Sequence, residues 1–157
     1  MKYTTENEFD SFDFQESYVK DIEPGNGYFH IWLDNVKILP ENSCNRDIRT
    51  MRTNNLLLAV SDTKIDSVVL EGVKIYHADG KLAKVRPDEE IAPEKYAKLW
   101  KAFLGGCIYS VSKDSKERRS ENAYTFILDT NEDETYEIKL TGSVDRESWD
   151  LFLNLGE

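Results

Sequence analysis

Long apolar runs are absent from this sequence of 157 residues. The longest aliphatic stretch, Leu56–Val60, is far shorter than the ~20 residues that a membrane-spanning helix needs. The first 14 residues lack a basic start followed by an apolar segment, so we expect no secretory signal and a cytoplasmic location. Cys44 and Cys107, the only two cysteines, belong to no CxxC or Cys/His cluster. We therefore expect reduced thiols rather than a disulfide.

Glycine and proline are scarce, with 8 and 4 residues, whereas 11% of the chain is aromatic. This composition is too rich in core-forming residues for a disordered chain. The length predicts a single domain, residues 1–157, that folds without a disulfide or a metal. Because the sequence contains no glycine-rich phosphate loop, no GxSxG and no HExxH motif, we expect no catalytic residues and no cofactor.

Histidine is also rare, and the patterns around it do not predict a metal site. His30 and His77 have no second ligand at the spacing that metal sites use. The acidic loop that begins at Asp129 resembles a calcium loop only at its first positions. Glu134 stands where that loop requires glycine, and Leu140 stands where it requires a bidentate glutamate. We therefore expect no metal ligands.

Basic residues are outnumbered, since 20 lysines and arginines face 30 carboxylates and the net charge is −10. Residues 1–34 carry 8 acidic and 2 basic side chains, and residues 129–157 carry 9 and 2. This charge disfavours nucleic acid and anionic membranes, which bind basic surfaces, and favours a basic protein partner. The alternative is that the charge serves only solubility. The predicted partner-binding surface comprises Asp129, Glu132, Asp133, Glu134 and Glu137.

Alternating apolar residues predict mainly antiparallel β structure. Several segments have this period-2 pattern, among them residues 28–33, 124–128 and 136–140. One amphipathic helix is predicted over residues 93–104, with proline in its first turn and Gly105 after its last. A short C-terminal helix is predicted from Asp145, a suitable N-cap, to Gly156. We expect an antiparallel barrel or strongly curved sheet of about seven to nine strands, an arrangement in which such segments commonly pack.

Aromatic residues on one strand offer a second candidate site. Tyr28, His30 and Trp32 recur at alternate positions, as they would on a stacking platform. Together with Trp100 they would line a cavity for a small apolar or sugar-like ligand. The alternative is that these side chains form a second layer of the hydrophobic core.

The residues 136–141, followed by 145–149, resemble the closing strand and the tryptophan-bearing helix of pleckstrin-homology domains. The resemblance covers about 20 residues and implies a small β-barrel closed by a C-terminal helix, and a phosphoinositide-binding module. The helix predicted at 93–104 departs from that family's pattern, and the net charge of −10 opposes a phosphoinositide ligand.

Two hypotheses of different classes follow. The first is a non-catalytic acidic protein that binds a basic protein, as immunity and inhibitor proteins neutralise cationic toxins. The second is a β-barrel that binds a small ligand at its aromatic strand face, or a pleckstrin-homology-like module. An enclosed cavity beside the aromatic residues would favour the second hypothesis.

Overall fold

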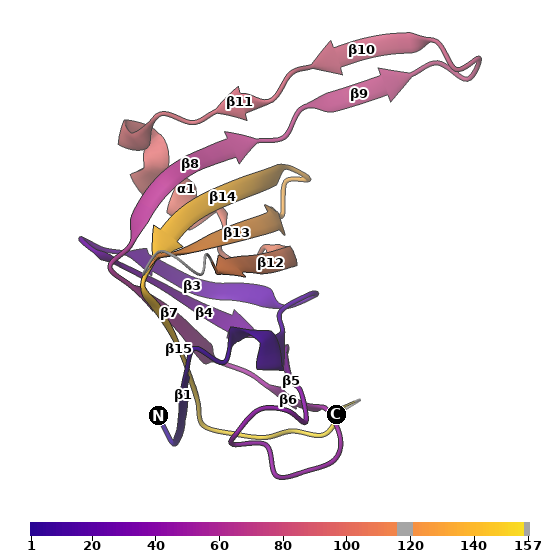
Figure 1. The fold of residues 1–157 in the computed structure, drawn as a ribbon. Helices are drawn as coiled ribbons and strands as arrows, with labels where there is room; N and C mark the ends of the chain where they lie inside the picture. Colours follow the sequence, from indigo (N-terminus) through magenta and orange to yellow (C-terminus); the bar gives the residue numbers. More distant parts are fainter. Residues whose placement is uncertain (116–120, 156–157) are drawn as a thin grey trace.

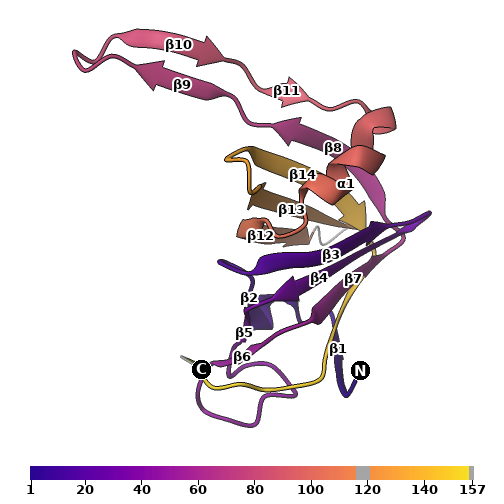
Figure 2. The ribbon, with the colours of Figure 1, turned by 180° about the vertical axis from the view of Figure 1, so that it is seen from behind.

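The computed structural model describes residues 1–115 and 121–155, which form fifteen strands and one α-helix (Figures 1 and 2). The prediction of mainly antiparallel β structure is confirmed. The strands are β1 (Tyr3–Glu6), β2 (Phe12–Asp13), β3 (Tyr18–Pro24), β4 (Tyr28–Asp34), β5 (Val36–Ile38), β6 (Met51–Thr53), β7 (Leu56–Ser61), β8 (Lys64–Leu70), β9 (Val73–Tyr76), β10 (Leu82–Arg86), β11 (Glu89–Glu90), β12 (Cys107–Ser115), β13 (Asn122–Asp129), β14 (Thr135–Gly142) and β15 (Val144–Trp149).

Ten of these strands form one sheet in the order β1-β15-β7-β4-β3-β12-β13-β14-β8-β11. The sheet divides into two halves, because β3 and β12 share only the pair Tyr18–Cys107. The halves face each other, and the ring centroids of Phe29 on β4 and Phe126 on β13 are 5.5 Å apart. The sheet is strongly curved, but the described strands do not close into the predicted barrel, and they exceed the predicted seven to nine.

The space between the halves is filled by the alternate residues of the predicted strands. On β4, Phe29, Ile31 and Leu33 are fully buried, and Phe126 and Leu128 on β13 are equally inaccessible. On both strands these alternate apolar residues face inward, and the residues between them face outward. A second, three-stranded sheet of β2, β5 and β6 adds Phe12 and other buried residues to the same core.

The predicted helix at 93–104 is present in shorter form. A 3₁₀ turn, η2 (Pro93–Lys95), leads into α1 (Tyr96–Ala102). The Trp100 ring lies 6.2 Å from Phe29 on β4, and Phe103, directly after the helix, lies 5.1 Å from Tyr136 on β14. The apolar face of α1 therefore contacts both halves of the sheet. No helix in the described part of the chain is long and apolar enough to cross a membrane.

The predicted C-terminal helix is wrong, because residues 144–149 form the strand β15 between β1 and β7. Asp145, Glu147 and Trp149 occupy alternate positions of this strand and are all fully buried. Two of the three inward residues of β15 are thus acidic, which hides the usual alternation of apolar and polar residues. The tryptophan-bearing helix of the pleckstrin-homology resemblance is absent from the same residues.

Strands β9 and β10 form a hairpin that projects away from the rest of the molecule (Figures 1 and 2). We call residues 73–86 the arm. The pair Asp79–Gly80 favours a two-residue turn, but the observed turn also contains Ala78. His77 and Lys81 close it: the backbone N–H of His77 donates to the carbonyl of Lys81 at 2.7 Å, and the N–H of Gly80 donates to the carbonyl of His77 at 2.9 Å. Gly80 has a φ of +87°, a conformation that glycine adopts without strain.

Candidate functional site

The predicted acidic surface lies on and beside the turn between β13 and β14. The backbone N–H of Thr130 donates to the carbonyl of Glu134 at 2.7 Å, and the Thr130 hydroxyl accepts the N–H groups of Glu132 and Glu134. Asp133 has a φ of +59°, a conformation that aspartate tolerates better than most residues. These bonds hold the backbone and leave the acidic side chains at the surface.

The five predicted carboxylates differ in their contacts. Asp129 accepts a 2.6 Å hydrogen bond from the Thr135 hydroxyl, and Glu137 lies 3.6 Å from the ammonium of Lys139. Within the described residues, the side chains of Glu132, Asp133 and Glu134 have neither a hydrogen bond nor an ion pair. These three carboxylates therefore remain available to an external cation.

The structure brings further acidic residues to this turn, and local sequence patterns could not identify them. Leu70, the last residue of β8, pairs with Tyr136 on one side and with Glu89 on the other. The next residue, Glu71, donates its backbone N–H to the carbonyl of Thr135 at 2.8 Å, and Asp88 accepts the N–H of Gly72 at 2.6 Å. We name the whole cluster the acidic end: Glu71, Asp88, Glu89, Asp129, Glu132, Asp133 and Glu134.

The electrostatic effect of the acidic end is felt by Tyr136, which lies beside it. Burial raises the pKa of Tyr136, and the negative charges of Glu134 and Glu89 raise it further. Like charges from β11 and from the β13–β14 turn therefore act on one site. This convergence depends on the register of β8 with β14, whose paired residues Leu70 and Tyr136 are 66 positions apart in the sequence.

The predicted aromatic site is only partly assembled. Tyr28, His30 and Trp32 lie on the outer face of β4, with ring centroids 4.6 Å apart between the first two and 5.9 Å between the last two. Trp100 lies on the other side of the sheet, where it packs against Phe29. The sheet thus separates Trp100 from the other three rings, which form a partly exposed row.

Five surface depressions of the described residues lie elsewhere. One of about 610 Å³ is lined by the loop after β5 and by the C-terminal segment. Its lining residues include Cys44, Arg46 and Phe152 but none of the four aromatic residues predicted to bind a ligand. This depression is open to solvent and mixes polar with apolar groups, so it does not resemble an enclosed apolar cavity.

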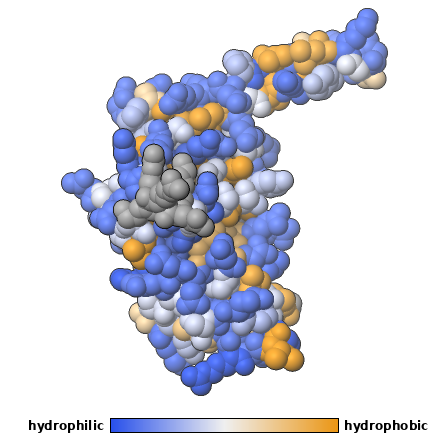
Figure 3. Space-filling model, in the orientation of Figure 1, coloured by the Kyte–Doolittle hydropathy of each residue, from blue (hydrophilic) through white to orange (hydrophobic). Residues whose placement is uncertain are grey.

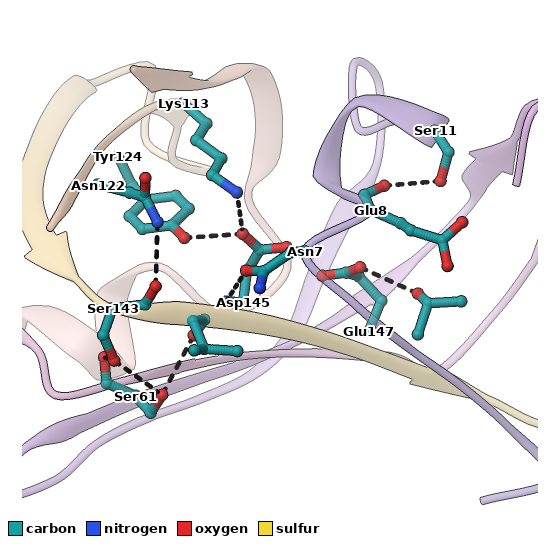
Figure 4. A network of polar contacts seen from close by, with 12 residues as sticks. Asn7, Glu8, Ser11, Ser61, Lys113, Asn122, Tyr124, Ser143, Asp145 and Glu147 are labelled. Atoms are coloured by element: carbon teal, nitrogen blue, oxygen red, sulfur yellow. Dashed lines mark hydrogen bonds and ion pairs between the residues drawn. The ribbon is translucent and has the colours of Figure 1, made fainter. Parts of the chain in front are cut away.

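A buried polar network surrounds the acidic face of β15 (Figure 4). Lys113 on β12 and the hydroxyl of Tyr124 on β13 both donate to the Oδ1 atom of Asp145, at 2.6 and 2.8 Å. On the neighbouring inward position, Glu147 accepts a 3.0 Å hydrogen bond from the hydroxyl of Thr5. The second oxygen of each carboxylate has no further partner among the described residues, apart from the other carboxyl group.

The two carboxylates of this network have opposite pKa shifts. Burial opposes ionisation of Asp145, but hydrogen bonds from Glu147, Lys113 and Tyr124 outweigh it and lower its pKa. Burial and the adjacent Asp145 carboxylate raise the pKa of Glu147 to about 9. At neutral pH Glu147 is therefore protonated, beside an ionised Asp145.

Lys113 is 11% exposed and lines a depression of about 350 Å³ together with Asn7, but the two carboxyl groups of the network are not open to a substrate. Asp145 and Glu147 are both fully buried. The described residues contain no group of three or more His, Cys, Asp or Glu side chains arranged to hold a metal ion. The chain matches no family model, no curated protein and no solved structure.

Proposed function

We propose that this chain is a non-catalytic interaction protein, and that its acidic end binds a basic surface of another protein. The observation that carries the proposal is the convergence of seven carboxylates from three chain segments at one end of the sheet. Three of them, Glu132, Asp133 and Glu134, have no polar partner in the described part of the chain. Grouped like charges repel each other, and a cationic partner relieves that repulsion.

A non-catalytic role is supported by the burial of the most perturbed acidic groups. Glu147 and Asp145 have the shifted pKa values expected of acid–base catalysts, but neither is accessible to a substrate. The proposal places binding in the cytoplasm, a compartment in which unpaired thiols such as Cys44 and Cys107 stay reduced.

The proposal is tested by a variant that removes only the exposed charge. The triple substitution Glu132→Gln, Asp133→Asn and Glu134→Gln neutralises the turn, and asparagine tolerates the positive φ of position 133. A matched control neutralises three exposed carboxylates elsewhere, through Asp10→Asn, Glu41→Gln and Asp66→Asn. Proteins captured from native lysate by the parent chain and by both variants are compared by quantitative mass spectrometry.

We expect a basic protein that the parent chain and the control variant capture and the turn variant loses. Capture that is equal for all three proteins, or a specific partner as acidic as this chain, would contradict the proposal.

The outer face of β4 supports a second candidate function, binding of a planar or sugar-like ligand. The row of Tyr28, His30 and Trp32 offers consecutive rings on which such a ligand would stack. Trp32→Ala should abolish a saturable binding signal from such a ligand in calorimetry, whereas Trp100→Phe should leave it unchanged. Loss of binding in both variants would contradict a site on the outer face.

A further inference from the structure

The arm exposes apolar side chains that the rest of the molecule does not cover. Figure 3 shows hydrophobic residues along the projecting hairpin. Five large apolar side chains of the arm are each between 42% and 58% exposed: Val73, Ile75, Tyr76, Leu82 and Val85. An isolated two-stranded hairpin is at best marginally stable in water, and apolar side chains gain stability when they are buried. The arm therefore presents a surface suited to a partner.

Each face of the arm combines apolar and cationic groups. Ile75 pairs with Lys84 and Val73 pairs with Arg86, so these four residues share one face and line a shallow groove of about 240 Å³. On the other face, Lys74 pairs with Val85. A surface that covers the arm must therefore supply apolar contacts and negative charge together.

The charge of the arm is opposite to that of the rest of the chain. Residues 73–86 contain four basic side chains and one acidic side chain, a net charge of +3 with histidine neutral, which leaves −13 for the remaining residues. Lys74 and Lys84 have no polar side-chain partner among the described residues. The complementary negative surface is the acidic end, whose Glu71 and Asp88 directly flank the base of the arm.

We propose that the arm binds a second copy of this chain. In a two-fold symmetric pair, two arms that run antiparallel place the tip of each arm at the base of the other. Lys81, beside the tip of each arm, then lies against the acidic end of the partner, and the exposed apolar side chains of both arms are buried together. One self-complementary patch used twice is the commonest geometry of protein dimers. Contact between two arms alone is disfavoured, since both carry net positive charge.

This inference does not rest on the proposed function, although the two use the same carboxylates. A basic partner protein and the second copy's arm would compete for the acidic end. The dimer is measured with the purified chain alone, so its failure leaves the binding of another protein open, and the reverse also holds.

The test is a charge exchange between the two contacting surfaces. One variant, Lys81→Glu with Lys84→Glu, changes the net charge of the arm from +3 to −1. A second variant, Glu71→Lys, Glu89→Lys, Glu132→Lys and Glu134→Lys, changes the net charge of the acidic end from −7 to +1. A matched control, Lys20→Glu with Lys101→Glu, reverses two exposed lysines outside the arm. Molar mass is measured by sedimentation equilibrium over a range of concentrations, and circular dichroism checks that every variant is folded.

We expect the parent chain and the control to dimerise with a dissociation constant below ~1 mM, and each of the two other variants to dimerise at least tenfold more weakly. An equimolar mixture of the arm variant and the acidic-end variant should restore a dimer, because both of its contacts again join opposite charges. A parent chain that stays monomeric at ~1 mM, or variants that dimerise as well as the parent, would overturn the proposal. A mixture of the two variants that remains monomeric would also overturn it. The same holds for a parent chain that is monomeric and binds an unrelated acidic protein through its arm.

Discussion

The substitution Glu147→Gln should stabilise the folded protein at neutral pH, although it alters a fully buried residue. In the unfolded chain the glutamate ionises near its ordinary pKa of 4.5, whereas in the folded protein its pKa is about 9. Between these values the folded state holds a proton that the unfolded state releases. Because the unfolded state binds fewer protons in this window, stability falls as the pH rises from 4.5 towards 9.

The size of this effect follows from the width of the window. Each pH unit above 4.5 costs the folded state about 1.4 kcal/mol, which amounts to about 3 kcal/mol at pH 7. Glutamine is neutral in both states and avoids this cost. Its amide nitrogen can donate to the Oδ2 atom of Asp145, and its amide oxygen can accept the Thr5 hydroxyl in place of the carboxyl oxygen. The lowered pKa of Asp145 acts at acidic pH in both proteins and largely cancels in the comparison.

The assay is urea unfolding of the parent chain and of Glu147→Gln at pH values from 5 to 8. We expect the free energy of unfolding of the variant to exceed that of the parent only slightly at pH 5. The difference should grow by about 4 kcal/mol between pH 5 and pH 8. Glu121→Gln, at an exposed position, serves as the control and should change stability by less than about 0.5 kcal/mol. A variant that is less stable at every pH, or a difference independent of pH, would refute protonation of Glu147 in the folded state.

Three further substitutions test the buried network, the core and the arm, each by chemical or thermal unfolding. Lys113→Met removes the cation that pairs with buried Asp145 and should destabilise the protein by roughly 3–5 kcal/mol at neutral pH; a loss below about 1 kcal/mol would contradict a strong ion pair. Phe126→Ala leaves a cavity between the two halves of the sheet and should cost roughly 3–5 kcal/mol, whereas a small loss would mean that the halves do not pack tightly. Gly80→Ala forces alanine to a φ of +87° and should lower the stability of the arm alone, seen as faster amide exchange at residues 73–86 with little change in global unfolding.

The strands with regular alternation could be predicted from sequence because each faces the core on one side only. Phe29, Ile31 and Leu33 alternate with partly exposed residues, and the same holds around Phe126. The pair Asp79–Gly80 also indicated where the hairpin turns, although the observed turn contains Ala78 as well. These signals are local and do not depend on which strand pairs with which.

The strand β15 could not be predicted, because its inward positions are acidic. Asp145 and Glu147 suit the first turn of a helix, and Trp149 fits either period. The two buried carboxyl groups are tolerated only because Lys113, Tyr124 and Thr5, which lie on other strands, donate hydrogen bonds to them. Such partners, which lie far away in the sequence, leave no local trace.

Prediction of the acidic end from sequence is limited in the same way, because some of its residues come together only through strand pairing. The turn residues Glu132, Asp133 and Glu134 are adjacent in the sequence and could be identified as a cluster. Glu71 and Glu89 join them only through the pairing of β8 with β14 and β11. The negative charge of this surface was therefore predictable from composition. Which residues belong to the surface depends on the register of the strands.

The central claim, electrostatic binding of a basic protein at the acidic end, is tested most directly by association kinetics. The association rate constant for a partner recovered from lysate is measured from low to high ionic strength, at chain concentrations that keep the protein monomeric. Exposed charges are screened beyond about 8 Å at physiological ionic strength, so we expect the rate to fall at least about tenfold with salt. The variant Glu132→Gln, Asp133→Asn and Glu134→Gln should start from a slower rate and depend less on salt, and the control Asp10→Asn, Glu41→Gln and Asp66→Asn should behave like the parent. An association rate that does not change with salt, or that is the same in the turn variant and the parent, would contradict the claim.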